Sequence, residues 1–232
     1  MVASSERLSG RIMKELQRQI LNGEILPGKK LPSQRCLASQ LGVSRESVRE
    51  AVTDLQNRGL IETYHGGGSF CKNLFEGFYD LPMRDNDQSS LALQLNVMEM
   101  REVLEGEAAY FAALRATPEQ RQRLTAEYQR MLERGVADTT ITKAKADLTF
   151  HMMIAESSHH FIVMSISQVL YSKYFNAMYG VLSRTLKLSG RYPPKIAIQH
   201  SDIYQAIMDR DGNLARNAAQ QHIRYTRDQL SV

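Results

Sequence analysis

The stretch Leu37–Leu60 constrains the fold of this chain more than any other part of its sequence. It predicts a helix, a tight turn at Gly42 and a second helix that begins at Ser44. Apolar side chains recur along the second helix at i, i+3, i+4 and i+7, the spacing of one buried face. They are Val48, Ala51, Val52 and Leu55. Arg45 and Arg49 lie one turn apart near its start, outside that face. A helix that buries one side and presents arginines from its first turns suits the DNA major groove.

Elements on both sides complete a winged helix-turn-helix. A preceding helix is predicted to begin after Ser9, which would cap it. Its apolar face is formed by Ile12, Leu16 and Ile20. Ser33 can cap the helix before the turn, and Leu37 and Leu41 are expected to point inward. Two β-prone runs, 60–64 and 69–71, are joined by glycines and predict a hairpin. Those glycines permit positive φ angles, so the hairpin tip can approach DNA closely.

The charge distribution agrees with a DNA-binding N-terminal part. Residues 1–72 contain eleven lysines and arginines against seven acidic residues, whereas residues 73–232 contain eighteen of each. The whole net charge of +4 therefore lies in the segment with the helix-turn-helix pattern, as expected for a unit that binds a polyanion. Cys36 and Cys71 are the only cysteines, which makes a disulfide framework improbable. No apolar run approaches the roughly 20 residues of a membrane span, and the N-terminus lacks an apolar signal core. We expect a cytoplasmic protein without a membrane partner.

Arg35, Arg45 and Arg49 are the predicted nucleic-acid contacts. An arginine can hold guanine O6 and N7, or a phosphate, through two hydrogen bonds. The alternative is that these arginines pair with Glu46 and Glu50 on a solvated helix face. The buried stripe, the predicted hairpin and the charge asymmetry together favour DNA binding.

A nearly continuous run of about fifty residues resembles the N-terminal domain of the GntR family of bacterial transcription regulators. The matching elements are Pro27-Gly28, Leu31-Pro32-Ser33, Arg35, Leu37-Ala38, Leu41-Gly42-Val43-Ser44-Arg45, Val48-Arg49-Glu50-Ala51, Leu55, Gly59-Leu60 and Gly66-Gly67-Gly68. The resemblance implies operator contacts from Arg35, Arg45 and Arg49 and from the wing glycines Gly66, Gly67 and Gly68. Ser44, which opens the second helix, joins this predicted DNA-binding set. The wing tip reads His65-Gly66-Gly67-Gly68-Ser69 where Gln-Gly-x-Gly-Thr is more usual, so its contact is expected to differ in detail.

The second part of the chain is predicted to be entirely helical. Residues 73–90 read as a linker with three aromatic side chains, Phe75, Phe78 and Tyr79, that pack against one of the domains. Helices are expected at about 91–115, 118–134, 140–157, 161–188, 194–210 and 213–230. We therefore predict a mainly α protein: a winged helix-turn-helix domain at 1–72, made of three helices and a β-hairpin, a linker at 73–90, and an all-α bundle of six or seven helices at 91–232.

Four residues of the second part form a metal-ligand pattern. Asp147 and His151 are four residues apart and share a helix face, while His200 and His222 come from the last two predicted helices. Their neighbours are apolar, which points to the bundle interior. One carboxylate and three imidazoles would suit a divalent transition metal. Spacing alone leaves open that these histidines are surface residues or hydrogen-bonded core residues.

Residues 91–229 resemble the helical effector-binding domain of the FadR subfamily, the FCD domain. The matching stretches are Glu99–Glu105, Ala112-Ala113, Asp147-x-x-Phe150-His151-x-x-Ile154-Ala155, His200-x-x-Ile203-x-x-Ala206-Ile207 and Ala215-x-x-Ala218-x-x-x-His222. The resemblance implies that Asp147, His151, His200 and His222 hold a metal ion. Zinc is the first expectation, with nickel or manganese as alternatives. One pattern is broken, because Glu156-Ser157-Ser158-His159-His160 follows Ala155 where x-Ala-Ser-x-Asn is commoner.

Arg101 is the predicted effector-binding residue. It places a charge in a largely apolar helix face, which is costly unless the charge is paired. The alternative is a salt bridge to Glu105, one turn further on. The resemblance implies that Arg101 helps to bind an effector carboxylate beside the metal. Other stretches are most similar to the lactate, glycolate and pyruvate regulators, which favours a small 2-hydroxy or 2-keto acid; citrate-like and sugar acids remain open.

The sequence thus predicts a ligand-responsive transcription regulator rather than an enzyme. It is expected to bind palindromic double-stranded operator DNA as a homodimer, because a twofold protein presents two equal recognition helices. A metal-dependent enzyme that acts on a small organic acid is the alternative from another class. A third possibility is a structural metal that only stiffens the bundle. No glycine-rich phosphate loop, nucleophile elbow or paired-carboxylate device favours the enzyme.

Overall fold

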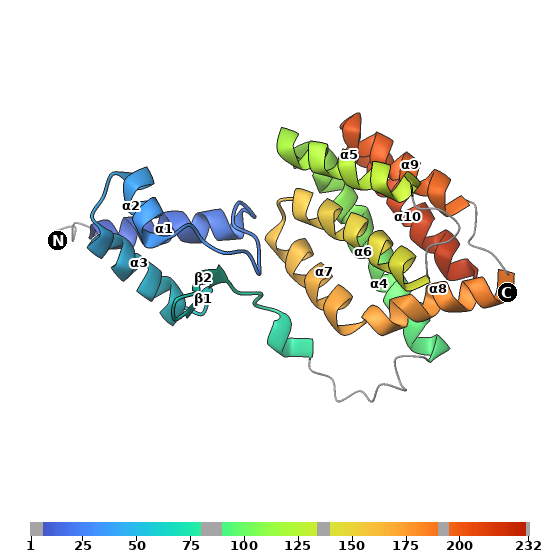
Figure 1. Ribbon diagram of the computed structural model, residues 1–232, viewed down its shortest axis with the longest axis horizontal. Helices are drawn as coiled ribbons and strands as arrows, with labels where there is room; N and C mark the ends of the chain where they lie inside the picture. Colours follow the sequence, from blue (N-terminus) through green and yellow to red (C-terminus); the bar gives the residue numbers. More distant parts are fainter. Residues whose placement is uncertain (1–6, 80–89, 134–139, 190–194, 231–232) are drawn as a thin grey trace, which may run out of the picture. The chain divides into compact units, whose positions relative to one another are not determined.

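The computed structural model describes residues 7–79, 90–133, 140–189 and 195–230 (Figure 1). Contacts within the chain group it into two compact units, residues 1–77 and 78–232. The first unit contains three helices and a β-hairpin, and the second contains seven helices in its described part. This confirms the predicted fold class, a mainly α chain with a winged helix-turn-helix before an all-helical bundle.

The N-terminal unit is built on the predicted apolar faces. Its helices are α1 (Leu8–Leu21), α2 (Gln34–Leu41) and α3 (Arg45–Asn57). Helix α1 packs against α3, and both bury the side chains that the periodicity selects. Leu55 and Val48 of α3 and Ile20 of α1 have no exposed area. Burying a side chain of this size contributes about 1.5–3 kcal/mol, so the two stripes account for much of the stability of this small unit.

The ends of these helices confirm two of three predicted caps. The hydroxyl oxygens of Ser33 and Ser44 accept hydrogen bonds from the backbone N–H groups of Cys36 and Ser47. Gly42 closes α2 in the left-handed conformation at φ 64°, which glycine adopts without strain. The prediction for Ser9 is wrong, because α1 already begins at Leu8 and its cap position is Arg7, without a side-chain cap bond.

Leu41 is also not the inward-facing residue that was predicted. It is 39% exposed, whereas Leu37 is buried as expected. Helix α2 has only eight residues and ends at Leu41, and the left-handed turn at Gly42 then leads the chain away. Leu41 is the last residue of this short helix, so the packing that buries Leu37 one turn earlier does not extend to it.

The wing consists of β1 (Ile61–Tyr64) and β2 (Gly68–Cys71), paired antiparallel with Ile61 opposite Cys71. The predicted hairpin is therefore confirmed. Sequence reasoning missed a third segment at its outer edge, where the backbone N–H of Leu31 donates to the carbonyl of Ser69 and that of Cys71 donates to Lys29. The loop before α2 thus adds backbone hydrogen bonds to β2 and fixes the wing to the helical part.

A single long helix organises the C-terminal unit. After a short 3-10 helix, η1 (Glu76–Tyr79), residues 80–89 of the predicted linker lie outside the described residues. The helices of the bundle are α4 (Leu91–Arg115), α5 (Pro118–Glu133), α6 (Thr140–Ser157), α7 (Phe161–Lys173), α8 (Phe175–Ser189), α9 (Lys195–Met208) and α10 (Gly212–Asp228). Helix α4 packs against α6, α7, α8, α9 and α10 (Figure 1). Among the described residues, no helix combines the length and the apolar character that a membrane crossing needs.

The break between α7 and α8 corrects the predicted helix 161–188. That segment lacks proline and is interrupted at Tyr174, with φ −110°. Tyr174 and Phe175 pack against a core cluster that includes Val97 of α4 and Leu170 of α7. We attribute the break to the packing of these two adjacent aromatic side chains. Such packing does not change the helical periodicity of the sequence, so the break could not be predicted from it.

The packing predicts a difference in reactivity between the two thiols. Burial raises the pKa of Cys71 to about 12, whereas Cys36 on α2 is exposed. At about pH 8 the folded chain should react with a thiol reagent at one site per chain, because only a thiolate attacks and Cys71 stays protonated. Mass spectrometry of the labelled protein checks this. Unfolding in denaturant should expose the second thiol, and labelling of Cys71 in the folded chain at the rate of Cys36 would contradict the packing.

Candidate functional site

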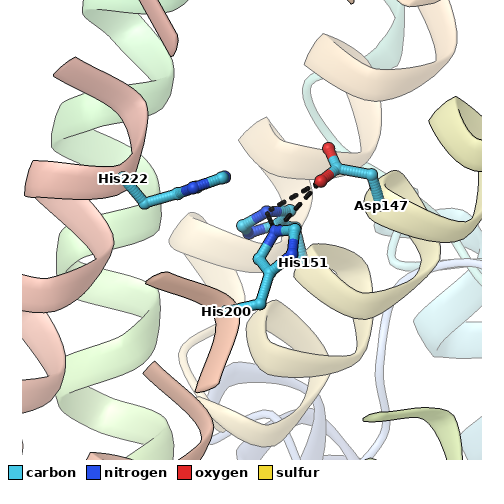
Figure 2. A group of neighbouring side chains, drawn as sticks. All are labelled: Asp147, His151, His200 and His222. Carbon is cyan, nitrogen blue, oxygen red and sulfur yellow. Dashed lines mark hydrogen bonds and ion pairs between the residues drawn. The ribbon is translucent and has the colours of Figure 1, made fainter. Parts of the chain in front are cut away.

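Three helices of the bundle bring four ligand-type side chains together. Asp147 and His151 come from α6, His200 from α9 and His222 from α10 (Figure 2). Each offers one ligand atom, and these atoms all lie within 4.8 Å of one another. The three histidines are buried, with exposed fractions of 2–3%, and Asp147 is half-buried. The structure thus places side by side the four residues that the sequence selected as metal ligands.

Apolar packing on each helix explains why these side chains meet. Asp147 and His151 share a face of α6 because they are one turn apart. The ring of Phe150 stands edge-on to both His151 and His200, with centroids 5.7 and 5.5 Å away. Tyr204, one turn after His200, stacks on Tyr128 of α5 at 4.4 Å and so anchors α9 beside the cluster.

The distances inside the cluster are those of donors that face a common point. Nε2 of His200 lies 3.0 Å from Oδ1 of Asp147, and Nε2 of His151 lies 3.4 Å from Nε2 of His200 and 3.8 Å from the same carboxylate oxygen. The ring centroid of His222 lies 5.2 Å from that of His151 and 4.5 Å from that of His200. Ligand atoms bound about 2.1 Å from one ion are roughly 3–4 Å apart, so this spacing fits a shared metal.

The protonation states also fit a metal site. Burial would raise the pKa of Asp147, but the hydrogen bond from His200 and the neighbouring imidazoles outweigh it and hold the pKa well below its usual range. Burial, reinforced by His200 and His151, lowers the pKa of His222 well below that of a free imidazole. Nδ1 of His222 is buried without a hydrogen-bond partner among the described residues. A deprotonated carboxylate and a neutral imidazole are the forms that bind metal.

Arg101 makes the salt bridge that the alternative prediction expected. Its Nε lies 2.6 Å from Oε1 of Glu105, and both side chains are about 5% exposed. Burial would lower the pKa of Arg101, but Glu105 and Asp147 raise it above its ordinary value, so the guanidinium is charged. Nη1 contacts the sulfur of Met98 at 3.7 Å. Nη2 has no hydrogen-bond partner among the described residues and lies 3.9 Å from Oδ2 of Asp147, so this buried nitrogen can donate to a ligand beside the cluster.

Glu105 and Tyr171 belong to the site although sequence reasoning gave neither a functional role. The hydroxyl of Tyr171, on α7, donates to Oε1 of Glu105 at 2.6 Å, and Oε2 lies 2.8 Å from Nδ1 of His151. Burial would raise the pKa of Glu105, but Arg101 and His151 hold it well below its usual range. A signal was present for Glu105, which lies one turn from Arg101. None was present for Tyr171, which is 66 residues away in the sequence.

The predicted DNA contacts in the N-terminal unit lie on its surface. Arg35 is exposed on α2, and Arg45 and Arg49 are exposed on the first two turns of α3, whose cap is Ser44. Arg49 pairs with Glu46 at 2.5 Å, as the alternative interpretation expected, whereas Arg35 and Arg45 form no ion pair within the described residues. An exposed pair of this kind contributes at most about 1 kcal/mol, so a phosphate or a base can replace Glu46.

Gly66 and Gly67 lie in the turn between β1 and β2, and Gly68 is the first residue of β2. Gly66 and Gly68 have φ values of 70° and 94°, which L side chains rarely adopt, and Gly67 donates its N–H to the carbonyl of Tyr64. A Cβ on Gly68 would also lie 2.6 Å from Cε of Lys30. The backbone therefore favours glycine at positions 66 and 68, whereas the Lys30 side chain can move aside.

The chain combines a winged helix-turn-helix that exposes arginines with a helical bundle that holds a buried polar cluster. This combination is that of a two-part DNA-binding transcription regulator. Comparison with known families agrees for both parts. Residues 8–71 match the family described as bacterial regulatory proteins, gntR family, and residues 96–225 match the FCD domain. The chain belongs to the GntR family and carries an FCD domain, which confirms both resemblances seen in the sequence.

Relatives of nearly full length support this assignment. The Glc operon transcriptional activator of Escherichia coli K12 is 30% identical over 222 residues, which cover 94% of this chain and 87% of that protein. A protein of the same strain named for regulation of the L-lactate dehydrogenase operon is 28% identical over 237 residues, covering 97% and 87% of the two chains. The solved structure of Streptococcus agalactiae GntR has a TM-score of 0.50 at 25% identity and covers 95% of this chain and 99% of that one. These relatives are transcription regulators, so the chain is a DNA-binding regulator and not an enzyme.

The burial of the Arg101 pair predicts a large effect on stability. Replacing Arg101→Ala leaves Glu105 as an unpaired buried charge, so the free energy of unfolding should fall by about 3–5 kcal/mol. Arg224→Ala is the matched control, because Arg224 pairs with Glu102 at 2.6 Å on the bundle surface and should lose at most about 1 kcal/mol. Urea unfolding measures both variants. Equal losses would show that the Arg101 pair is not as enclosed as described.

Proposed function

We propose that this regulator binds a small carboxylate beside a divalent metal in its FCD domain, and that this binding changes its affinity for operator DNA. The carrying observation is the cluster of Asp147, His151, His200 and His222. Beside it lies Nη2 of Arg101, which has no hydrogen-bond partner in the part of the chain that the structure describes. The metal would supply an electrophilic point for a carboxylate, hydroxyl or keto oxygen. Arg101 would bind a second oxygen of the same ligand through Nη2.

The donor set favours a transition metal of intermediate softness. Three imidazoles and one carboxylate suit zinc first, with nickel or manganese as alternatives, whereas calcium and magnesium prefer oxygen ligands. Four ligands from this chain leave further positions open for an effector when the ion accepts five or six ligands. An effector that coordinates the ion directly would be selected by its charge and by its second oxygen.

Charge balance supports a monocarboxylate effector. Histidine binds a metal as the neutral imidazole, so only Arg101, Glu105 and Asp147 contribute protein charge at a loaded site, and their sum is one net negative charge. A divalent cation converts it to one net positive charge, which a single carboxylate neutralises. We therefore favour a small 2-hydroxy or 2-keto acid such as lactate, glycolate or pyruvate. One relative is named for the L-lactate dehydrogenase operon, and lactate is a 2-hydroxy acid, so that name agrees with this proposal.

For DNA recognition we propose that α3 enters the major groove by its first turns. Arg45 and Arg49, with Ser44 at the helix start and Arg35 on α2, would contact bases or phosphates, and Gly66, Gly67 and Gly68 would let the wing backbone approach the duplex. Glu50 and Asp54 follow Arg49 on the outer side of α3 and would repel phosphates. That charge distribution limits the contact to the N-terminal half of the helix.

We further propose a homodimer on a palindromic operator, working in the bacterial cytoplasm where chromosomal DNA is found. Two identical α3 helices can read two identical half-sites only when their separation matches that of the sites. An effector that binds one conformation of the bundle better than another shifts the population of conformations. The effector site and the DNA-binding surface are then coupled, and the change in operator affinity equals the coupling free energy between them.

Metal removal tests the site. Stripping the purified chain with a chelator should lower its melting temperature, and adding zinc should restore it, because a ligand that binds only the folded state stabilises it. His200→Ala should abolish most of the zinc-dependent shift. His160→Ala is the control, since His160 caps α7 outside the cluster.

The same preparations test the effector. Lactate, glycolate and pyruvate are added in turn to zinc-loaded and zinc-free protein on its preferred DNA, and the Kd for DNA is measured at about 0.15 M salt, since salt sets such affinities. We expect at least one acid to change the Kd, and only with zinc bound. Zinc binding without any acid-dependent change in the Kd would indicate a purely structural metal.

A pair of arginine variants tests the DNA interface. Arg45→Ala should weaken binding to the preferred sequence, selected from random DNA, by about 1–3 kcal/mol, or roughly 5- to 150-fold in Kd. Arg58→Ala is the matched control, because this arginine lies at the far end of α3 and pairs with Asp54. Fluorescence anisotropy gives both values. If Arg58→Ala costs as much as Arg45→Ala, the contact is not made by the start of α3.

A further inference from the structure

We propose that Glu105 is a positioning residue of the metal site, which fixes the proton of His151 on Nδ1 and so leaves Nε2 free to bind the ion. This inference rests on the metal site proposed above. It goes beyond it because Glu105 is not one of the four ligands. Nε2 of His151 is the nitrogen that faces Asp147 and His200 (Figure 2). Its Nδ1 lies 2.8 Å from Oε2 of Glu105.

The two oxygens of Glu105 have different partners. Oε1 receives two donors at 2.6 Å each, the hydroxyl of Tyr171 and Nε of Arg101, and a guanidinium nitrogen can only donate. Oε2 lies 2.8 Å from Nδ1 of His151, within ion-pair distance, and is otherwise buried without a hydrogen-bond partner among the described residues, so no other donor competes for it there. A neutral imidazole carries one proton, and a carboxylate beside one of its nitrogens draws the proton to that nitrogen. The other nitrogen then presents its lone pair to the metal.

The same asymmetry makes Glu105→Gln an informative substitution. Two donors at the Oε1 position would hold the amide oxygen of the glutamine there. Its NH2 group would then occupy the Oε2 position and face Nδ1 of His151. Because an NH2 group donates, it favours an unprotonated Nδ1 and places the ring proton on Nε2. The nitrogen that should bind the metal would carry a hydrogen, although the side chain has kept its size and shape.

The experiment compares zinc affinity in full-length protein, stripped of metal, by competition with a chromophoric chelator at one pH near neutrality. Glu105→Gln should raise the Kd for zinc about 10- to 100-fold, the usual cost of losing such a partner of a ligand. Glu107→Gln is the control on the same helix. It breaks the partly exposed pair with Arg216, at 2.7 Å, and should change the Kd by no more than about twofold.

A second measurement does not depend on the folding of the variant. Long-range 1H–15N spectra of the zinc-bound wild-type protein, labelled at histidine, report which nitrogen of each ring carries the proton. We expect His151 to be protonated at Nδ1 and to bind through Nε2. The Glu105→Gln variant without metal should show the proton on Nε2. A purely structural role of Glu105 would lower thermal stability without exchanging the two forms.

The outcomes separate this inference from the proposed function. If the wild-type chain binds zinc through His151 and Glu105→Gln binds it equally tightly, the positioning role is wrong and the metal site stands. Coordination of zinc through Nδ1 of His151 would likewise overturn the inference alone. If the wild-type chain binds none of zinc, nickel and manganese, the proposed metal site fails and the inference fails with it.

Discussion

The buried pair of Arg101 and Glu105 is the interaction on which the bundle depends. Two charges inside a protein cost several kcal/mol each in lost hydration, and their attraction repays this only when further hydrogen bonds satisfy them. Here the hydroxyl of Tyr171 donates to Glu105 and Nδ1 of His151 lies 2.8 Å from its other oxygen, so helices α4, α6 and α7 meet at one carboxylate. Helix α4 also contacts α8, α9 and α10. Glu105, which orders the polar side chains on α4, therefore affects the whole bundle. The position of the histidine cluster follows from this arrangement.

The two parts of the chain use polar groups in opposite ways. In the N-terminal unit the core is purely apolar, and the arginines of α2 and α3 are exposed, either unpaired among the described residues or held by weak surface pairs. They can therefore exchange their partners for DNA at little cost. In the bundle the polar groups are enclosed, where the same interactions are stronger and more selective. This difference agrees with a regulator in which one part recognises a large polyanion by its surface and the other binds a small solute in its interior.

The sequence predicted elements whose residues are close together along the chain. The stripe from Val48 to Leu55, the caps Ser33 and Ser44, the hairpin and most helix bounds follow from local periodicity and turn chemistry. The convergence of Asp147, His151, His200 and His222 did not follow from spacing, and it was anticipated only by resemblance to a known domain. Features decided by packing were missed or wrong, such as the break at Tyr174, the hydrogen bonds of Leu31 and Cys71 at the wing and the exposure of Leu41. The role of Glu105 also depends on tertiary structure, because its partner Tyr171 comes from a distant helix.

The cluster draws its side chains from α6, α9 and α10, which are separated by long intervening segments of the chain. An ion held there would join these segments only in the folded chain, whereas a disulfide also constrains the unfolded chain, and the binding free energy of the ion would add to the stability of the fold. A disulfide is formed once, whereas this cross-link would be present only in proportion to the free metal around the protein. The rigidity of the bundle, and with it the response to a small acid, would then follow the metal supply of the cell, so that one helical domain integrates two nutritional signals.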